Sequence, residues 1–183
     1  GYCWGRGDLN QLGLAADSLC SPDLRPINVA CTLTPKRFAA TVSLQSVSAG
    51  AGTACGIGVD SQIYCWGRDD LGQLGDGSRG TAVVDRVVRA TVGNERFKAV
   101  SVGGRPTVPT FSLLYGEPGK VAEVGSAHAC AISLSDRIFC WGSDSSGQLG
   151  DARTIHSSTP IPLAELYQNI SWSRVSAGGF HTC

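Results

Sequence analysis

The stretch IYCWGRDDLGQLG at residues 63–75 decides the fold, because the chain repeats it. It returns as IFCWGSDSSGQLG at residues 138–150, and YCWGRGDLNQLG at residues 2–13 is a third copy. Self-similarity of this kind is the signature of a repeat architecture, in which each repeat is one supersecondary unit. The sequence therefore predicts a chain built from copies of one small β unit.

A second unit precedes the complete copies of this motif. It reads VSAG at residues 47–50 and again at residues 175–178, where it leads to Cys183. Cys130 and Cys183 lie 53 residues apart, and we take this spacing as the base period. The longer distances between the other copies are then explained by two insertions, at about residues 14–34 and 105–121.

Each complete copy predicts a β-hairpin with a defined register. Side chains alternate between the two faces of a strand, so Ile63 and Cys65 share one face while Tyr64 and Trp66 share the other. The expected cross-strand pairs, which are the unit of sheet stabilisation, are Cys55 with Cys65, Ile57 with Ile63, Cys130 with Cys140, and Ile132 with Ile138. This register requires a connecting loop of about three or five residues.

Composition excludes several classes of protein. The 183 residues hold 15 basic and 15 acidic side chains, whereas a nucleic-acid-binding surface usually needs a basic excess. No run of about 20 apolar residues is present that could span a membrane. With 24 glycines and 8 prolines, the chain favours strands and turns, and the best helical candidate is the short segment Leu163–Gln168. We expect one all-β domain over residues 1–183, with no cofactor.

The 8 cysteines could be disulfides, metal ligands or buried free thiols. Zinc knuckles have a Cys-x2-Cys spacing, which this chain does not contain, so no metal site is expected. A Cys-x9-Cys spacing occurs twice across a predicted hairpin, which favours the disulfides Cys55–Cys65 and Cys130–Cys140. Cys20 and Cys31 would close the first insertion as a loop. Disulfides indicate a periplasmic or secreted protein.

The second insertion is the candidate partner-binding segment. Within residues 105–121, prolines flank a largely apolar run. Apolar residues outside the repeat pattern often mark an interaction site, and the candidates are Phe111, Leu113, Leu114 and Tyr115. The alternative is a flap that covers its own sheet.

The repeated motif, with VSAGGFHTC at residues 175–183 before a Cys-Trp-Gly strand, resembles the regulator of chromosome condensation repeat. The resemblance extends over nearly the whole chain apart from the two insertions. It implies a seven-bladed β-propeller in which every blade is a four-stranded antiparallel sheet. The cysteine-containing variant resembles secreted bacterial members more than the nuclear exchange factor. The resemblance indicates the fold and leaves the activity open.

The number of repeats departs from the family pattern. About three repeats cannot close a propeller, for which about four to eight blades are typical. We therefore expect this chain to be part of a larger propeller whose remainder lies outside it. In that arrangement Cys3 and Cys183 lie too far apart to form an intramolecular disulfide.

The remaining polar and aromatic candidates are expected to be structural. A catalytic residue would not recur in repeat after repeat, so His128 and His181 are expected to bond a neighbouring strand or loop. Three tryptophans at equivalent positions are expected to anchor the core between blades, namely Trp4, Trp66 and Trp141. The tripeptide Arg6-Gly7-Asp8 is expected to occupy an ordinary turn rather than to bind a receptor, because its equivalents lack this sequence.

The leading functional hypothesis is a non-enzymatic, extracytoplasmic scaffold that binds another protein. One alternative is a guanine-nucleotide exchange factor for a small GTPase, as the nuclear family member is, which requires a cytosolic or nuclear location. Another is a secreted inhibitor of an enzyme such as a β-lactamase. The oxidation state of the cysteines discriminates the exchange factor from the other two.

Overall fold

The computed structural model describes residues 1–21, 28–37, 42–105 and 126–183, and of residues 81–86 the backbone only. Within these ranges the chain forms antiparallel strands and one short 3-10 helix, η3 (Glu165–Tyr167). The strands are β1 (Tyr2–Arg6), β2 (Ser18–Cys20), β3 (Val29–Arg37), β4 (Leu44–Gly50), β5 (Thr53–Gly58), β6 (Ile63–Asp69), β7 (Thr81–Arg89), β8 (Phe97–Gly103), β9 (His128–Ser133), β10 (Ile138–Gly142) and β11 (Ser157–Pro162).

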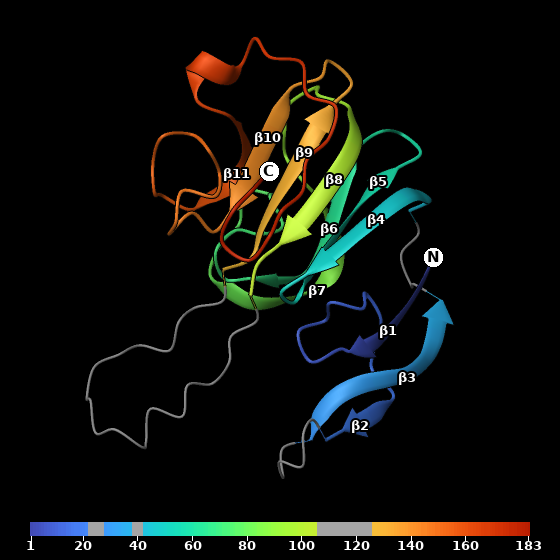
Figure 1. Ribbon diagram of the computed structural model, residues 1–183. Helices are drawn as coiled ribbons and strands as arrows, with labels where there is room; N and C mark the ends of the chain where they lie inside the picture. The colour runs from blue at the N-terminus through green and yellow to red at the C-terminus, as the bar shows by residue number, and fades with distance from the viewer. Residues whose placement is uncertain (22–27, 38–41, 106–125) are drawn as a thin grey trace, which may run out of the picture.

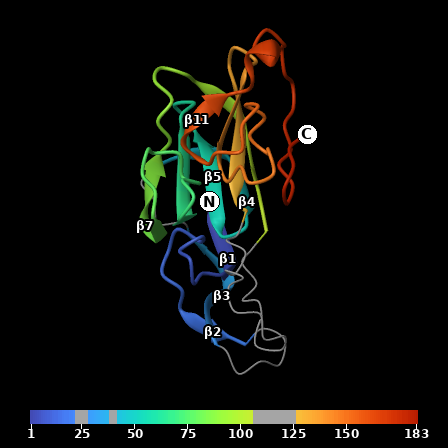
Figure 2. The same cartoon turned by 90° about the vertical axis from the view of Figure 1, so that its left-hand side faces the viewer.

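The strands form three sheets (Figure 1). The N-terminal sheet has the order β1-β3-β2, the middle sheet β4-β5-β6-β7, and the C-terminal sheet β8-β9-β10-β11. The two four-stranded sheets are simple meanders, because each strand pairs with the next one in the sequence. They lie side by side in both views, and the N-terminal sheet lies below them (Figures 1 and 2).

The hairpin registers agree with the sequence-based prediction. In the middle sheet Cys55 pairs with Cys65 and Ile57 with Ile63. The C-terminal sheet repeats the pattern, and its pairs are Cys130 with Cys140 and Ile132 with Ile138. The backbone of Gly58 bonds to that of Gln62, so three residues turn the first hairpin.

The two faces of a repeat have different neighbours. In the middle sheet the face with Ile57 and Cys65 packs against the C-terminal sheet, where it meets Phe139 and Trp141. Ala54 and Trp66 lie on the opposite face and pack against Cys3 of the N-terminal sheet. The cysteine face of one repeat thus contacts the tryptophan face of the next, and the hydrophobic core lies between the sheets.

The glycine of each Cys-Trp-Gly motif is required by its backbone conformation. Gly67 and Gly142 have φ angles of +103° and +97°, which side chains other than that of glycine rarely adopt. A Cβ atom on Gly67 would also lie 2.4 Å from the carbonyl oxygen of Gly52. At these glycines the ladder shifts register against the outer strand of the same sheet, so the bend of the repeated strand depends on them.

Two segments differ from the expectations. The segment Leu163–Gln168 was the helical candidate, and only the 3-10 turn η3 forms there, with no side chain capping its first residue. The first insertion was expected to be a disulfide-closed loop. It contains β2 and the start of β3, and Leu19 pairs with Ala30. The insertion therefore adds an edge strand to the N-terminal sheet.

Candidate protein-binding surfaces

Three disulfides join the cysteine pairs expected from their spacing. Cys55–Cys65 and Cys130–Cys140 bridge opposed residues of the hairpins, and each pair has a Cα–Cα distance of 4.1 Å. Cys20–Cys31 links β2 to β3 with a Cα–Cα distance of 5.9 Å. The four hairpin cysteines have no exposed surface, so these two bridges are part of the core. Cys3 and Cys183 are unbonded, as expected.

The tryptophans connect each repeat to the preceding one. Nε1 of Trp66 donates a hydrogen bond of 3.0 Å to the carbonyl oxygen of Gln11. In the next repeat Nε1 of Trp141 donates one of 2.8 Å to the carbonyl oxygen of Gln73. Both indoles are buried, whereas Trp4 is 59% exposed. The expected core role is therefore confirmed for two of the three tryptophans, and Trp4 lies on the surface.

Serines of the first strands make a second link between repeats. The hydroxyl oxygen of Ser48 accepts a hydrogen bond of 2.9 Å from the backbone nitrogen of Val102. The hydroxyl oxygen of Ser101, the equivalent serine, accepts one of 2.9 Å from the backbone nitrogen of Ala177. The strands that begin with Val-Ser are thus joined in series, each to the next.

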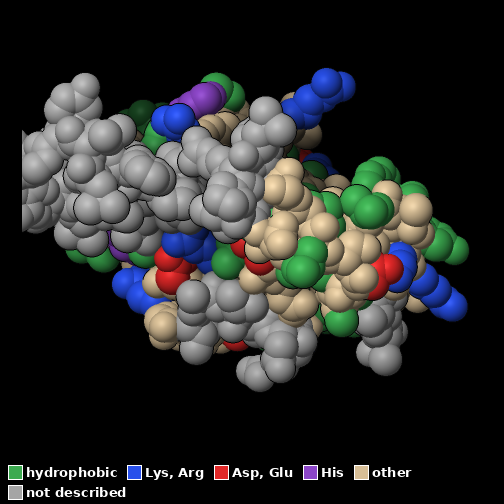
Figure 3. Space-filling view, turned by 90° about the horizontal axis from the view of Figure 1, so that it is seen from below, with side chains coloured by type: hydrophobic (Ala, Val, Ile, Leu, Met, Phe, Trp, Pro, Cys, Tyr) green, Lys and Arg blue, Asp and Glu red, His purple; other side chains and the backbone are tan. Residues whose placement is uncertain are grey.

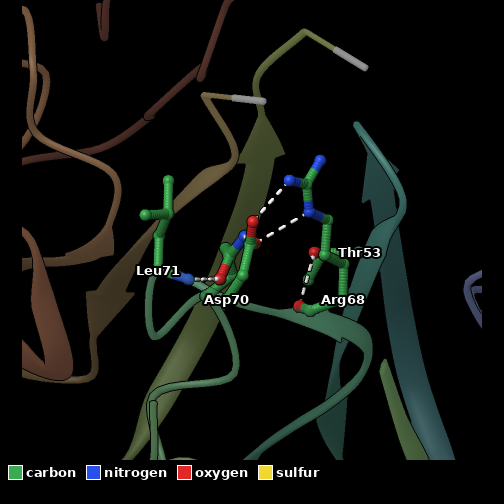
Figure 4. A network of polar contacts seen from close by, with 5 residues as sticks. Thr53, Arg68, Asp70 and Leu71 are labelled. Atoms are coloured by element: carbon green, nitrogen blue, oxygen red, sulfur yellow. Dashed lines mark hydrogen bonds and ion pairs between the residues drawn. The ribbon is translucent and has the colours of Figure 1, made fainter. Parts of the chain in front are cut away.

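The loops that follow the Cys-Trp-Gly strands are held by polar contacts within themselves (Figure 4). Arg68 Nε donates to Asp70 Oδ1 at 2.7 Å, and the Thr53 hydroxyl donates to the Arg68 carbonyl oxygen at 3.0 Å. Gln73 Oε1 accepts the backbone N–H of Leu71 at 2.7 Å. These polar groups satisfy one another, which indicates a structural role.

A buried carboxylate supports each complete loop. Asp69 Oδ1 accepts the backbone N–H of Leu74, and Oδ2 accepts the Ser78 hydroxyl at 2.8 Å. Asp144 Oδ1 makes the equivalent bond to Leu149, but Asp144 Oδ2 has no partner. Burial raises the pKa of both carboxyl groups, because it disfavours their ionised form.

His128 bonds a neighbouring segment, as expected. Its Nε2 lies 3.0 Å from the hydroxyl oxygen of Thr182, which donates to the carbonyl oxygen of Gln148 at 2.9 Å. Nε2 is then the donor to Thr182. Burial lowers the pKa of His128, because the imidazolium form is poorly solvated there. The histidine fastens the C-terminal segment to the C-terminal sheet.

The Arg-Gly-Asp tripeptide is an internal pair. Arg6 Nε donates to Asp8 Oδ1 at 2.6 Å, and the Gln11 amide also approaches this carboxylate. This is the arrangement of Arg68 and Asp70 in the next repeat, so the tripeptide occupies an ordinary repeat loop.

Two grooves open on the described surface. One, of about 450 Å³, lies between β1 and β4–β5, and Trp4, Val47 and Trp66 are among its lining residues. The other, of about 440 Å³, lies between the loop after β10 and the C-terminal segment, and Trp172 and Phe180 help to line it. Viewed from below, hydrophobic side chains are exposed among polar ones on the side of the N-terminal sheet (Figure 3).

The expected partner-binding residues Phe111, Leu113, Leu114 and Tyr115 lie outside the described residues, so their role stays a prediction. Within the described ranges, no group of three His, Cys, Asp or Glu side chains is placed to hold a metal ion. No helix in those ranges has the length and apolar character needed to cross a membrane.

Sequence reasoning missed the two grooves and the exposed cluster around η3. Leu166 is 81% exposed, and Tyr167 and Ile170 beside it are also exposed. The only available signal was the end of the repeat pattern at this point. The exposure of Trp4 was hidden as well, because its sequence context matches that of the buried tryptophans.

The repeats match known family models. The model of the regulator of chromosome condensation (RCC1) repeat matches residues 60–108 and 135–183, and a second RCC1 repeat model matches residues 120–148. The structure is also similar to the crystal structure of Prp20p from Saccharomyces cerevisiae, with a TM-score of 0.66 and 20% identity. The similarity covers 97% of this chain and 37% of Prp20p, and it concerns the fold alone.

Curated relatives are much longer proteins. The chain is 27% identical over 186 residues to the probable E3 ubiquitin-protein ligase HERC6 of Homo sapiens, which covers 99% of this chain and 15% of HERC6. It is 26% identical over 182 residues to the ultraviolet-B receptor UVR8 of Arabidopsis thaliana, covering 98% of this chain and 33% of UVR8. The chain thus spans a third or less of these relatives. Because the repeat models match more than half of its residues, the chain belongs to the RCC1 repeat family, and its sheets are blades of an RCC1-type β-propeller.

Proposed function

We propose that this chain is a protein-binding scaffold module that works outside the cytoplasm and catalyses no reaction itself. The observation that supports this most is the set of three disulfides. Two of them are completely buried between blades, and disulfides of this kind persist in oxidising compartments. Their reduction would remove cross-links from the centre of the fold.

The polar residues support a scaffold rather than an active site. The recurrent Arg, Asp and Gln side chains of the loops bond to one another and to the backbone. His128 is buried and engaged with Thr182. A substrate would have to displace these contacts to reach the groups, at the cost of unsatisfied buried polar atoms.

A protein is the expected type of partner. The net charge of zero gives no electrostatic preference for nucleic acid. The described surface offers apolar grooves next to rigid blades, and rigid elements with inserted loops are suited to protein recognition. The segment Phe111–Tyr115 stays the candidate contact, to be tested with the double substitution Phe111→Ser and Leu114→Ser.

The compartment is tested by trapping thiols in the source cells. Cells are lysed in iodoacetamide, and the protein is then reduced, labelled with N-ethylmaleimide and digested. We expect the six cysteines of the disulfides to carry N-ethylmaleimide and the protein to lie in the extracytoplasmic fraction. Iodoacetamide on these cysteines in a cytosolic fraction would contradict the proposal. Acceleration of GDP release from a small GTPase would favour the exchange factor instead.

A further inference from the structure

The outer edge of β1 has no partner strand among the described residues. β1 pairs with β3 on one side only, whereas the equivalent strands β6 and β10 pair on both sides. The groove of about 450 Å³ runs along this free edge. A strand edge with unpaired N–H and C=O groups is a template for another strand.

The side chains of this edge are those that a second strand would cover. Trp4 is 59% exposed and Tyr2 is 64% exposed, although Trp66 is buried at the equivalent position of β6. Cys3 is unbonded, although its equivalent Cys65 forms a disulfide with the neighbouring strand. Each of these residues is explained if a strand with a cysteine lies beside β1.

The C-terminal segment of the chain forms a strand of that type. Ser176 and Cys183 exchange both of their backbone hydrogen bonds, at 2.7 and 2.9 Å. The same register joins Ser48 to Cys55 and Ser101 to Cys130 in the complete blades. Residues 176–183 therefore have the arrangement of the first two strands of a blade, and the Cys183 thiol is free and exposed.

We propose that two copies of this chain associate head to tail, with the strand that ends in Cys183 of one copy pairing with β1 of the other. This inference is independent of the proposed function. Cys3 and Cys183 would then be opposed as Cys55 and Cys65 are, and would form an intermolecular disulfide. The two thiols give up two protons and two electrons, which reduce a small-molecule disulfide such as oxidised glutathione to two thiols.

Two further contacts within the chain predict the geometry of this interface. Trp4 Nε1 would donate to the Gln148 carbonyl oxygen of the other copy, as Trp141 does to Gln73. The Ser176 hydroxyl would accept the backbone N–H of Ala49, as Ser101 does from Ala177. The same chemistry that joins neighbouring blades thus recurs between copies.

The size of the assembly also follows from the repeats. Each copy contributes two complete blades and two complementary half-blades. Two copies joined at both ends would give a ring of about six blades, within the usual range for propellers.

The test uses two single variants, Cys3→Ser and Cys183→Ser, alone and mixed. Each is incubated with oxidised glutathione at about pH 8.5, because thiolate is the reactive form and burial raises the pKa of the Cys3 thiol. We expect a covalent dimer, seen on non-reducing gels, in the mixture but in neither variant alone. Peptide mapping should find Cys3 bonded to Cys183. A Cys3–Cys3 dimer in Cys183→Ser alone, or a mixture that stays monomeric with free thiols, would refute the second copy as the occupant and leave the edge to another strand.

A non-covalent measurement checks the interface without the disulfide. In the Cys3→Ser, Cys183→Ser background, light scattering should show a concentration-dependent dimer, and Trp4→Ala should raise its dissociation constant at least tenfold. Leu166→Ala is the matched control, because Leu166 is an exposed side chain on η3, away from both ends of the interface. An equal effect of the two substitutions would contradict the predicted role of Trp4.

Discussion

Gly75 leaves room for the indole of Trp141: a Cβ atom on Gly75 would lie 2.8 Å from Trp141 Nε1. Gly75 has a φ angle of +73° and belongs to the middle blade, whereas Trp141 belongs to the next one. The close approach allows Trp141 to reach the Gln73 carbonyl oxygen. The glycine at the end of the loop motif is therefore a packing residue between blades.

Substitution of this glycine should cost more than backbone strain alone. Gly75→Ala should lower the free energy of unfolding by about 2–4 kcal/mol, which combines strain at positive φ with overpacking against the indole. Gly147→Ala is the matched control, because Gly147 has nearly the same φ, +74°, and open space around it. That control should cost about 1–2 kcal/mol, and equal costs in urea unfolding would refute the packing role.

A pair of turn residues predicts opposite effects in the two complete blades. Ala152 has a φ angle of +66°, while its equivalent Gly77 has +91° and only a distant neighbour for a Cβ atom. Ala152→Gly should therefore stabilise the protein by up to about 1 kcal/mol, and Gly77→Ala should destabilise it by about 1–2 kcal/mol. Both values can be measured by urea unfolding, and a loss of stability in Ala152→Gly would contradict the prediction.

Asp144 should reduce stability as the pH rises. Its raised pKa means that the folded state holds the proton more tightly than the unfolded state. The resulting stability is complete below the ordinary value of 3.8 and is lost as the pH rises through the folded pKa. Asp144→Asn can still accept the Leu149 N–H and should be more stable than the wild type at pH 7.

Asp69→Asn is the comparison for this prediction, because Asp69 also accepts the Ser78 hydroxyl. We expect it to gain less stability than Asp144→Asn at pH 7. Urea unfolding between pH 3 and pH 8 measures both variants, and a wild type that matches Asp144→Asn at every pH would disprove the effect.

His128 should act in the opposite direction. Its lowered pKa means that the unfolded state binds the proton more readily, so the stability due to neutral His128 is complete above the ordinary value of 6.5 and is lost as the pH falls through the folded pKa. His128→Thr, which introduces the residue found at position 53, should flatten the decline between pH 7.5 and pH 5. Parallel pH profiles of wild type and variant would rule this out.

The hairpins could be predicted from the sequence because their determinants are local. Two cysteines and two isoleucines at matched spacings allow only one register with both pairs opposed, and the structure has that register. The family resemblance, also visible in the sequence, indicated the blade. Composition contributed the low helical content.

The contacts between blades could not be predicted, because they depend on how the sheets are placed. Nothing in the sequence near Ser48 indicates that its hydroxyl meets Val102. Trp4 has the same local sequence as Trp66, and only the absence of a strand beside β1 makes it exposed. The edge strand β2 was missed because three residues give too short a pattern for periodicity.

The placement of the disulfides simplifies oxidative folding. Eight cysteines permit about 105 complete connectivities, yet the three bridges join residues only 10 or 11 positions apart. Each bridge joins cysteines that follow one another along the chain, so a cysteine emerging during synthesis meets its correct partner first. The chain can therefore become oxidised blade by blade, without an isomerase having to exchange bridges between repeats.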